Sequence, residues 1–164
     1  MEFVSKTTIS SSVSSVTITG LTNYPRYKVF VSGFSPSGQC NWLYYLTDSA
    51  GTAYTSSYGN IIRRTSTSSG NNLAYGQLTT DTYSGYDTTM ELTLDETADG
   101  KMVSLTGTTT DRANTAGTAP YQSNTVFSTL TSASNIAVGG IKFAPSTAVN
   151  IIRGTIIIYG IKDS

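Results

Sequence analysis

The chain of 164 residues contains no histidine, and this absence excludes several kinds of chemistry at once. Ser-His-Asp and Cys-His catalysis, histidine metal sites and histidine proton shuttles all need an imidazole. Cysteine is nearly absent too. Cys40 stands alone, so an intrachain disulfide, a thiolate zinc cluster and a dithiol redox pair are excluded. Because Cys40 comes just before an apolar segment, we expect it to be a small buried side chain.

Charged residues are scarce and balanced. They make up 12% of the chain and sum to a net charge of zero, and Arg63-Arg64 is the sole basic pair. Binding to nucleic acid or to an anionic membrane depends on a concentrated positive field, so neither is expected. No apolar run is long enough for a membrane-spanning helix. The first residues lack the features of a secretory signal, so we expect a protein made in a cytoplasm.

Residues that favour strands are abundant. Serine and threonine make up roughly thirty per cent of the chain, well above ordinary usage. The chain also has eleven tyrosines and five phenylalanines, whereas disordered chains are poor in aromatic and β-branched residues. The composition therefore predicts a folded domain with a neutral, hydroxyl-rich surface.

Short runs with β propensity recur along the chain, separated by Gly, Asn, Ser and Pro, and no long segment has an apolar period of 3.6 residues. This spacing is typical of β-sandwiches. The sequence therefore predicts one all-β domain over residues 1–164, an antiparallel β-sandwich. The predicted strands cover residues 2–9, 13–19, 26–34, 41–48, 60–65, 72–78, 88–95, 101–109, 123–130, 136–143 and 151–161.

Turn residues separate these strands. Asp99-Gly100 predicts a hairpin between two alternating segments, and residues 49–51 and 69–72 are further turn candidates. Residues 109–123, which are poor in large apolar side chains, form the longest predicted loop. A loop of this length in a compact β domain is more often an interaction surface than a simple connection.

Two groups of aromatic residues are candidates for contact with a ligand or partner. The strand over 41–48 is apolar on both faces, which is typical of a central strand or of one covered by a neighbouring subunit. It supplies Trp42 and Tyr44. Tyr83 and Tyr86 flank a Ser-Gly turn and, with Tyr58, are candidates to stack on a sugar ring or on a partner chain. The alternative is that these tyrosines fold over the core.

Carboxylates are the remaining candidates for catalysis or metal binding. Any two of Asp48, Asp81, Asp87, Asp95 and Asp111 would serve a glycosidase if they met in one cleft, but no motif selects a pair. The sequence therefore assigns no catalytic residue.

The segment Leu-Asp-Glu-Thr-Ala-Asp-Gly has a faint likeness to a calcium-binding loop. Its acidic residues are Asp95, Glu96 and Asp99, and Lys101 stands where a further ligand would be needed. A polar hairpin tip is the favoured interpretation. We therefore expect no metal and no cofactor.

Both ends of the chain resemble a known class of viral proteins. The first matching stretch covers residues 11–31, Pro36 and 41–54, and the second covers 136–143 and 150–162, ending in Gly-Thr-Ile-Ile-Ile-Tyr-Gly-Ile-Lys. They resemble the opening and closing signatures of small β-sandwich proteins and tail-protein domains of double-stranded DNA phages, especially phages of aquatic bacteria. One difference is Ala50-Gly51, where similar sequences often carry Gly-Gly.

The resemblance implies a jelly-roll-like sandwich on the virion surface, often as a homotrimer. It implies a non-enzymatic structural protein of the tail or fibre apparatus or of head decoration, in contact with other virion proteins, and it supplies no catalytic residue. Residues 3–9 and 109–123 are the candidates for attachment. Two alternatives remain open: a carbohydrate-binding module that recognises a glycan on the host surface, and a glycan-degrading enzyme.

Overall fold

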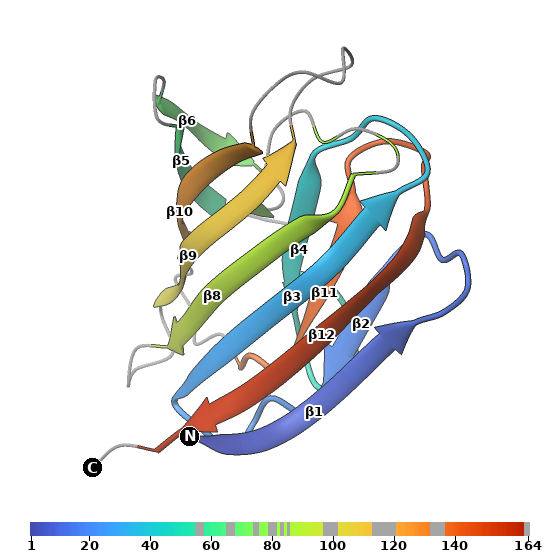
Figure 1. Ribbon diagram of the computed structural model, residues 1–164. Coiled ribbons are helices and arrows are strands. Elements are labelled where there is room, and N and C mark those ends of the chain that lie inside the picture. Colours follow the sequence, from blue (N-terminus) through green and yellow to red (C-terminus); the bar gives the residue numbers. More distant parts are fainter. Residues whose placement is uncertain are drawn as a thin grey trace.

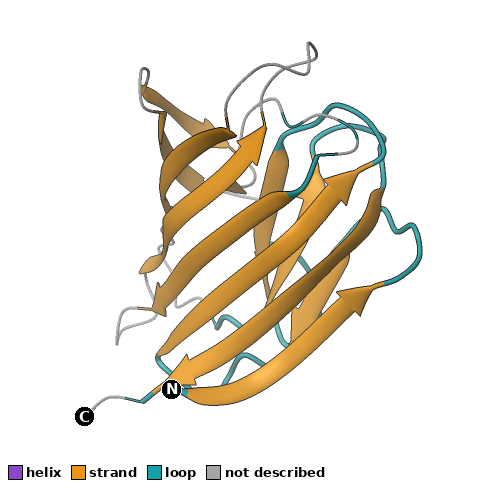
Figure 2. Ribbon diagram, in the orientation of Figure 1, coloured by secondary structure: helices purple, strands orange, loops and turns teal. Residues whose placement is uncertain are grey.

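The secondary structure consists of strands. The computed structural model describes residues 1–54, 58–64, 68–73, 76–78, 82, 84, 86–96, 102–112, 121–131 and 137–162. This part of the chain contains no helix (Figure 2), and so none that could cross a membrane. The strands are β1 (Glu2–Ile9), β2 (Val16–Thr19), β3 (Arg26–Pro36), β4 (Trp42–Thr47), β5 (Tyr58–Arg64), β6 (Ser68–Leu73), β7 (Gly76–Gln77), β8 (Thr88–Glu96), β9 (Met102–Arg112), β10 (Tyr121–Thr131), β11 (Gly140–Pro145) and β12 (Ile151–Ile161).

The strands form two antiparallel sheets that pack face to face (Figure 1). The large sheet has the order β1-β12-β3-β8-β9-β10-β5-β6, and the small sheet has the order β2-β11-β4-β7. β1 and β12 pair along their lengths, so the two ends of the chain lie at the same end of the large sheet.

Eight of these strands make a jelly roll. β1, β12, β3 and β8 lie side by side in the large sheet, and β2, β11, β4 and β7 lie side by side in the small one. Followed along the chain, these eight strands alternate between the large and the small sheet, except that β4 and β7 follow each other in the small sheet. This is the double Greek key of jelly rolls. β9, β10, β5 and β6 extend the large sheet beyond β8. The predicted fold class is therefore confirmed.

The predicted strands all overlap observed ones, and two loop predictions were wrong. Residues 69–72, predicted as a turn, lie inside β6 and pair with β5. The loop predicted over 109–123 is too long at both ends, because β9 extends to Arg112 and β10 begins at Tyr121, where the two residues pair. Threonine at 109 and 110 keeps β propensity without apolar character, which hid these strand ends. The turn at Asp99-Gly100 lies outside the described residues, although β8 and β9 pair as expected.

Alternation along β8 shows how the sequence divides core from surface. Met90, Leu92 and Leu94 are buried, while Glu91 and Thr93 point away from the core. Side chains of a strand point alternately to its two faces, so one face of β8 joins the apolar core and the other remains in contact with solvent.

The centre of the core is aromatic. The ring of Phe34 lies 5.1 Å from that of Trp42 and 5.9 Å from that of Phe143, measured between centroids. These three residues come from β3, β4 and β11, so their contacts join the two sheets. Cys40 is also buried, as expected from the sequence.

The strand β4 is central in the small sheet, between β11 and β7. Trp42 and Tyr44 face the other sheet and belong to the core. Leu43 and Thr47, on the opposite face of β4, are also buried within this chain. β4 is therefore a central strand with buried side chains on both faces, although Tyr45 on its outer face is only half-buried. Cover of this outer face by a neighbouring subunit stays a prediction.

Candidate functional site

The outer face of the large sheet, turned away from the small sheet, carries the most exposed apolar surface in the described chain. Phe3 on β1 is 62% exposed, and Met1 just before it is 80% exposed. Phe30 on β3 and Tyr159 on β12 lie beside them, together with Ile157. We call Met1, Phe3, Phe30, Ile157 and Tyr159 the apolar patch.

Strand register brings the members of the apolar patch together. Phe3 lies opposite Tyr159 in the β1–β12 pair, and Phe30 lies opposite Ile157 in the β12–β3 pair. The Tyr159 ring makes edge-to-face contacts with both phenylalanines, at centroid distances of 6.1 Å to Phe3 and 6.0 Å to Phe30. Met1, Phe30, Ile157 and Tyr159 line a shallow hollow. Such aromatic clusters are more typical of contact surfaces than of free surface.

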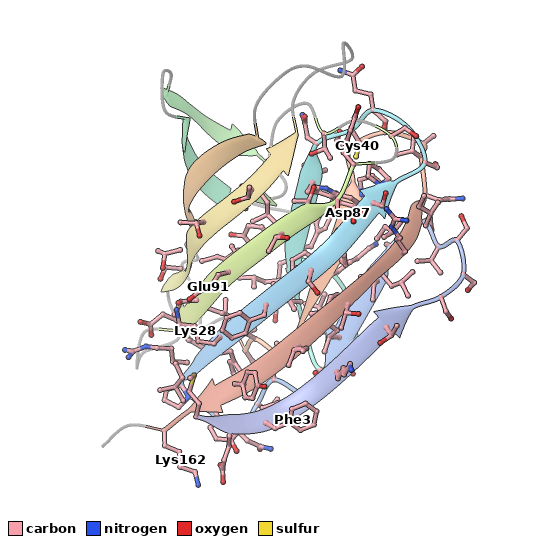
Figure 3. All side chains as sticks on the ribbon, viewed as in Figure 1. Phe3, Lys28, Cys40, Asp87, Glu91 and Lys162 are labelled. Atoms are coloured by element: carbon pink, nitrogen blue, oxygen red, sulfur yellow. The ribbon has the colours of Figure 1, made fainter. Side chains whose placement is uncertain are left out.

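Ion pairs border the apolar patch on the side of β8. Lys28 Nζ lies 3.3 Å from Glu91 Oε1, and Arg26 Nε lies 3.1 Å from Asp95 Oδ2. Figure 3 shows Lys28 and Glu91 close together on the outer face, and Phe3 near the edge of the sheet. Exposed ion pairs contribute little to stability, so these pairs mainly give the surface its pattern of charge.

A polar cluster closes the end of the sheet where the termini meet. The hydroxyl of Tyr24 donates to Glu2 Oε2 at 2.5 Å, and Lys162 Nζ lies 3.0 Å from the same oxygen. The hydrogen bond from Tyr24 and the nearby Lys162 ammonium lower the pKa of Glu2. The same hydrogen bond raises the pKa of Tyr24. The cluster fastens β1 to the ends of β12 and of the β2–β3 connection.

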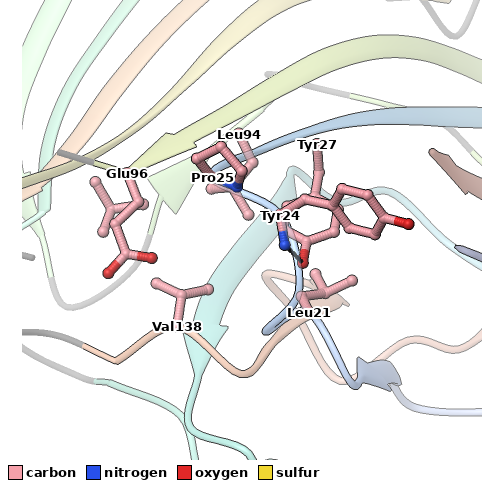
Figure 4. Close-up of a pocket in the computed structure, with 8 residues that line it drawn as sticks. Leu21, Tyr24, Pro25, Tyr27, Leu94, Glu96 and Val138 are labelled. Atoms are coloured by element: carbon pink, nitrogen blue, oxygen red, sulfur yellow. Dashed lines mark hydrogen bonds between the residues drawn. The ribbon is translucent and has the colours of Figure 1, made fainter. Parts of the chain in front are cut away.

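A small cavity between the sheets is too small for an organic ligand. It lies where β3 begins and β8 ends (Figure 4), and its volume is about 10 Å³, the space of roughly one water molecule. Glu96 lies at this cavity among apolar side chains, and burial raises the pKa of its carboxyl group. The cavity is lined by Leu21, Tyr24, Pro25, Tyr27, Leu94, Glu96, Val103 and Val138.

The structure describes the side chains of three of the five candidate contact residues predicted from the sequence. Trp42 and Tyr44 are 0% and 1% exposed, so they belong to the core and not to the surface. Tyr86 is half-buried. The side chains of Tyr58 and Tyr83 lie outside the described part of the structure.

Sequence reasoning had proposed Phe3 only as part of an attachment strand, and it missed Phe30, Ile157 and Tyr159. A signal for Phe30 was present, because it occupies the outward position between Lys28 and Ser32. The outward positions of Ile157 and Tyr159 could not be recognised from the sequence, because the neighbouring residues are apolar as well. The run from 156 to 161 is so rich in β-branched residues that it predicts a core strand without showing which face is exposed.

The carboxylates with described side chains have separate roles. Asp48 accepts hydrogen bonds from its own turn, Asp87 Oδ1 lies 2.8 Å from Arg153 Nη2, and Asp95 pairs with Arg26. Glu96 faces the small cavity, whereas Asp95 pairs on the outer face, so the two do not form the start of a calcium loop. Among the described residues, no group of three acidic or cysteine side chains is placed to hold a metal ion. Asp81, Asp99 and Asp111 lie outside the described side chains.

Comparison with known proteins identifies no relative, because no family model, curated protein or solved structure matches this chain. The outer face of the large sheet is the candidate functional surface because of its exposed aromatic side chains and its pattern of charge.

Proposed function

We propose that this chain is a non-enzymatic structural protein of a bacteriophage virion, made in the host cytoplasm and then built into the particle. It acts as a surface β-sandwich subunit of the tail or fibre apparatus or of head decoration. The observation that carries this proposal is the exposed apolar patch beside the edge strand β1. Aromatic residues and methionine are enriched where protein chains meet, so this face is suited to assembly.

The arrangement of the segments that resemble phage proteins supports virion membership. The matching residues, 11–31, 36, 41–54, 136–143 and 150–162, contribute to β2, β3, β4, β11 and β12. β11 pairs with β2 and β4 in the small sheet, and β12 pairs with β3 in the large sheet. The unmatched middle, residues 60–130, supplies the four strands added to the jelly roll, together with β7 and β8. The resembling segments thus form one continuous structural unit.

Two kinds of protein partner are part of the proposal: other copies of this chain, and other virion proteins. The resemblance implies three copies. β1 is the terminal strand of the large sheet, so the backbone groups along its outer edge pair with no strand in the described chain. An edge of this kind can receive a strand from another protein, which supports residues 3–9 as an attachment segment.

Mass spectrometry of purified phage particles tests virion membership. We expect peptides of this chain in density-banded particles, at a ratio to the major capsid protein that stays constant across the band. Antibody labelling in the electron microscope then distinguishes head from tail. Abundant protein in the lysate, with none in the banded particles, would refute the proposal.

A carbohydrate-binding role is the second candidate, favoured by the three neighbouring rings of Phe3, Tyr159 and Phe30. Aromatic rings and adjacent polar groups are features of small-molecule sites. A glycan array probed with the purified chain tests this role. Binding that is lost in Tyr159→Ala but kept in Tyr45→Ala, on the other sheet, would support it. No binding to any glycan on the array would remove it.

A further inference from the structure

We propose that the outer face of the large sheet binds the same face of a second copy of this chain. In this arrangement the two-fold axis lies in the plane of contact, parallel to the strands and midway between β12 and β3. The inference rests on the self-association part of the proposed function and deepens it by naming the face and the contacts. It follows from the order of side chains across four neighbouring strands.

One row of outward-facing residues is self-complementary. In the strand register Lys6 lies opposite Ile157, Ile157 opposite Phe30, and Phe30 opposite Glu91. The row therefore has a cation at one end, two apolar side chains in the middle and an anion at the other end. A two-fold axis through its middle reverses the order in the other copy. Lys6 then meets the partner's Glu91, and Ile157 meets the partner's Phe30.

The next row agrees with the same axis. Phe3 lies opposite Tyr159, Tyr159 opposite Lys28, and Lys28 opposite Thr93. Reversal places Tyr159 against the partner's Lys28, where an ammonium group and a ring attract each other. It also covers Phe3, the most exposed aromatic ring among the described residues, with the partner's Thr93.

Lys6 supplies an independent reason for this choice of partner. Arg26 and Lys28 on the same face each have a carboxylate within 3.3 Å. Lys6 has no ion pair among the described residues, although it stands directly beside the apolar patch. In the dimer each Lys6 gains a carboxylate, and Glu91 is shared between Lys28 and the partner's Lys6. Complementary charges at the ends of an apolar strip fix the register of an interface.

The size of the face predicts a weak dimer. Four strands about 4.8 Å apart, with outward positions about 6.8 Å apart, give a flat contact of about 500 Å² per copy over four rows. Standard stable interfaces bury about 800 Å² per partner. We therefore expect association that depends strongly on concentration, as suits subunits held at high density on one particle. The contact gives an even number of copies, in contrast to the three implied by the resemblance.

Charge reversal across the axis tests the proposal. In Lys6→Glu, each new glutamate faces the partner's Glu91, and in Glu91→Lys each new lysine faces the partner's Lys6. In a dimer of either single variant, like charges therefore face each other at both ends of the row. Mixed in equal amounts, the two variants form a heterodimer in which both ends pair opposite charges. Sedimentation equilibrium from micromolar to millimolar chain gives the dissociation constants.

We expect the wild type to dimerise, each single variant to dissociate at least about tenfold more readily, and the mixture to recover wild-type affinity. Lys142→Glu, a charge reversal on the small sheet, and Ile152→Ser, an exposed apolar residue outside the patch, should leave the dissociation constant unchanged. Circular dichroism checks that every variant is folded.

A wild-type monomer throughout the range, a trimer, or a dimer insensitive to both reversals would overturn the inference. So would loss of affinity in the single variants without recovery in the mixture. None of these outcomes changes the peptide content of phage particles, so a failure of this inference is distinguishable from a failure of the proposed virion role.

Discussion

The indole N–H of Trp42 donates a hydrogen bond of 2.9 Å to Thr88 Oγ1, and this bond joins the small sheet to the large one. Both side chains are completely buried, so no water is available to replace either partner. A buried donor left without an acceptor costs about 1–3 kcal/mol. We therefore expect Thr88→Val to lower the free energy of unfolding by about 1–3 kcal/mol, measured by urea denaturation.

A double-mutant cycle separates this hydrogen bond from packing. Trp42→Phe removes the donor and leaves a cavity, and Thr88→Val should cost much less in that background. We expect a coupling energy of about 1 kcal/mol, since neighbouring residues that share a bond are not additive. Equal costs of Thr88→Val in the two backgrounds would contradict the role assigned to the bond.

The turn after β4 depends on the carboxylate of Asp48. Its Oδ1 accepts hydrogen bonds from the backbone N–H groups of Ala50 at 2.9 Å and Thr52 at 2.8 Å, and Gly51 adopts φ +86° between them. We expect Asp48→Ala to lower the stability by about 1 kcal/mol, or the melting temperature by about 2–4 °C. Asp48→Asn keeps an acceptor oxygen and serves as the control. Equal loss in both variants would show that charge, and not the acceptor, matters.

Much of the fold was predictable from the sequence because its strands are locally distinct. β8 shows why, since Met90, Leu92 and Leu94 alternate with polar residues that face solvent. Most of β6 was predicted as a turn, because Gly70, Asn71 and Asn72 have turn propensity and adopt a strand through pairing with β5; the predicted strand over 72–78 covers only its last residues. Strand order was also out of reach. The pairing of β1 with β12 joins opposite ends of the chain, and no local pattern carries that information.

The candidate surface was harder to predict than the fold. It is assembled by register from β1, β12 and β3, which are remote in sequence, so Phe3, Phe30 and Tyr159 become neighbours only after folding. Trp42 and Tyr44 drew attention because they are large aromatic residues. Large aromatic residues form cores and interfaces alike, and only the folded structure shows that these two face the large sheet and belong to the core.

Two glutamates should shift the stability in opposite directions with pH. Burial raises the pKa of Glu96 above its ordinary value of 4.5, whereas the hydrogen bond from Tyr24 and the Lys162 charge lower that of Glu2. Folding therefore favours the protonated form of Glu96. The contribution of protonated Glu96 to the free energy of unfolding is lost as pH rises through the raised pKa. Folding favours the ionised form of Glu2, and that contribution is lost as pH falls through the lowered pKa.

Glutamine variants test these signs by urea unfolding from about pH 3 to about pH 7. Glu96→Gln should be more stable than the wild type at neutral pH, with the difference vanishing in acid. Glu2→Gln should be less stable at neutral pH, and its difference should vanish in acid as well. NMR titration of the two carboxyl carbons measures the pKa values directly, and a Glu96 value below that of Glu2 would contradict the assignment.

The single thiol should report global unfolding. Cys40 is 3% exposed, and burial raises the pKa of its thiol to about 12, so little thiolate is present near neutral pH and reagents cannot approach it. Because the thiolate is the reactive form, we expect labelling of the native protein to be slow and to accelerate across the urea transition. Phe3→Cys in a Cys40→Ser background places a thiol on the exposed patch and should label rapidly without urea. Rapid labelling of Cys40 in the native protein would mean that the end of the sandwich around β4 opens locally, well below the free energy of global unfolding.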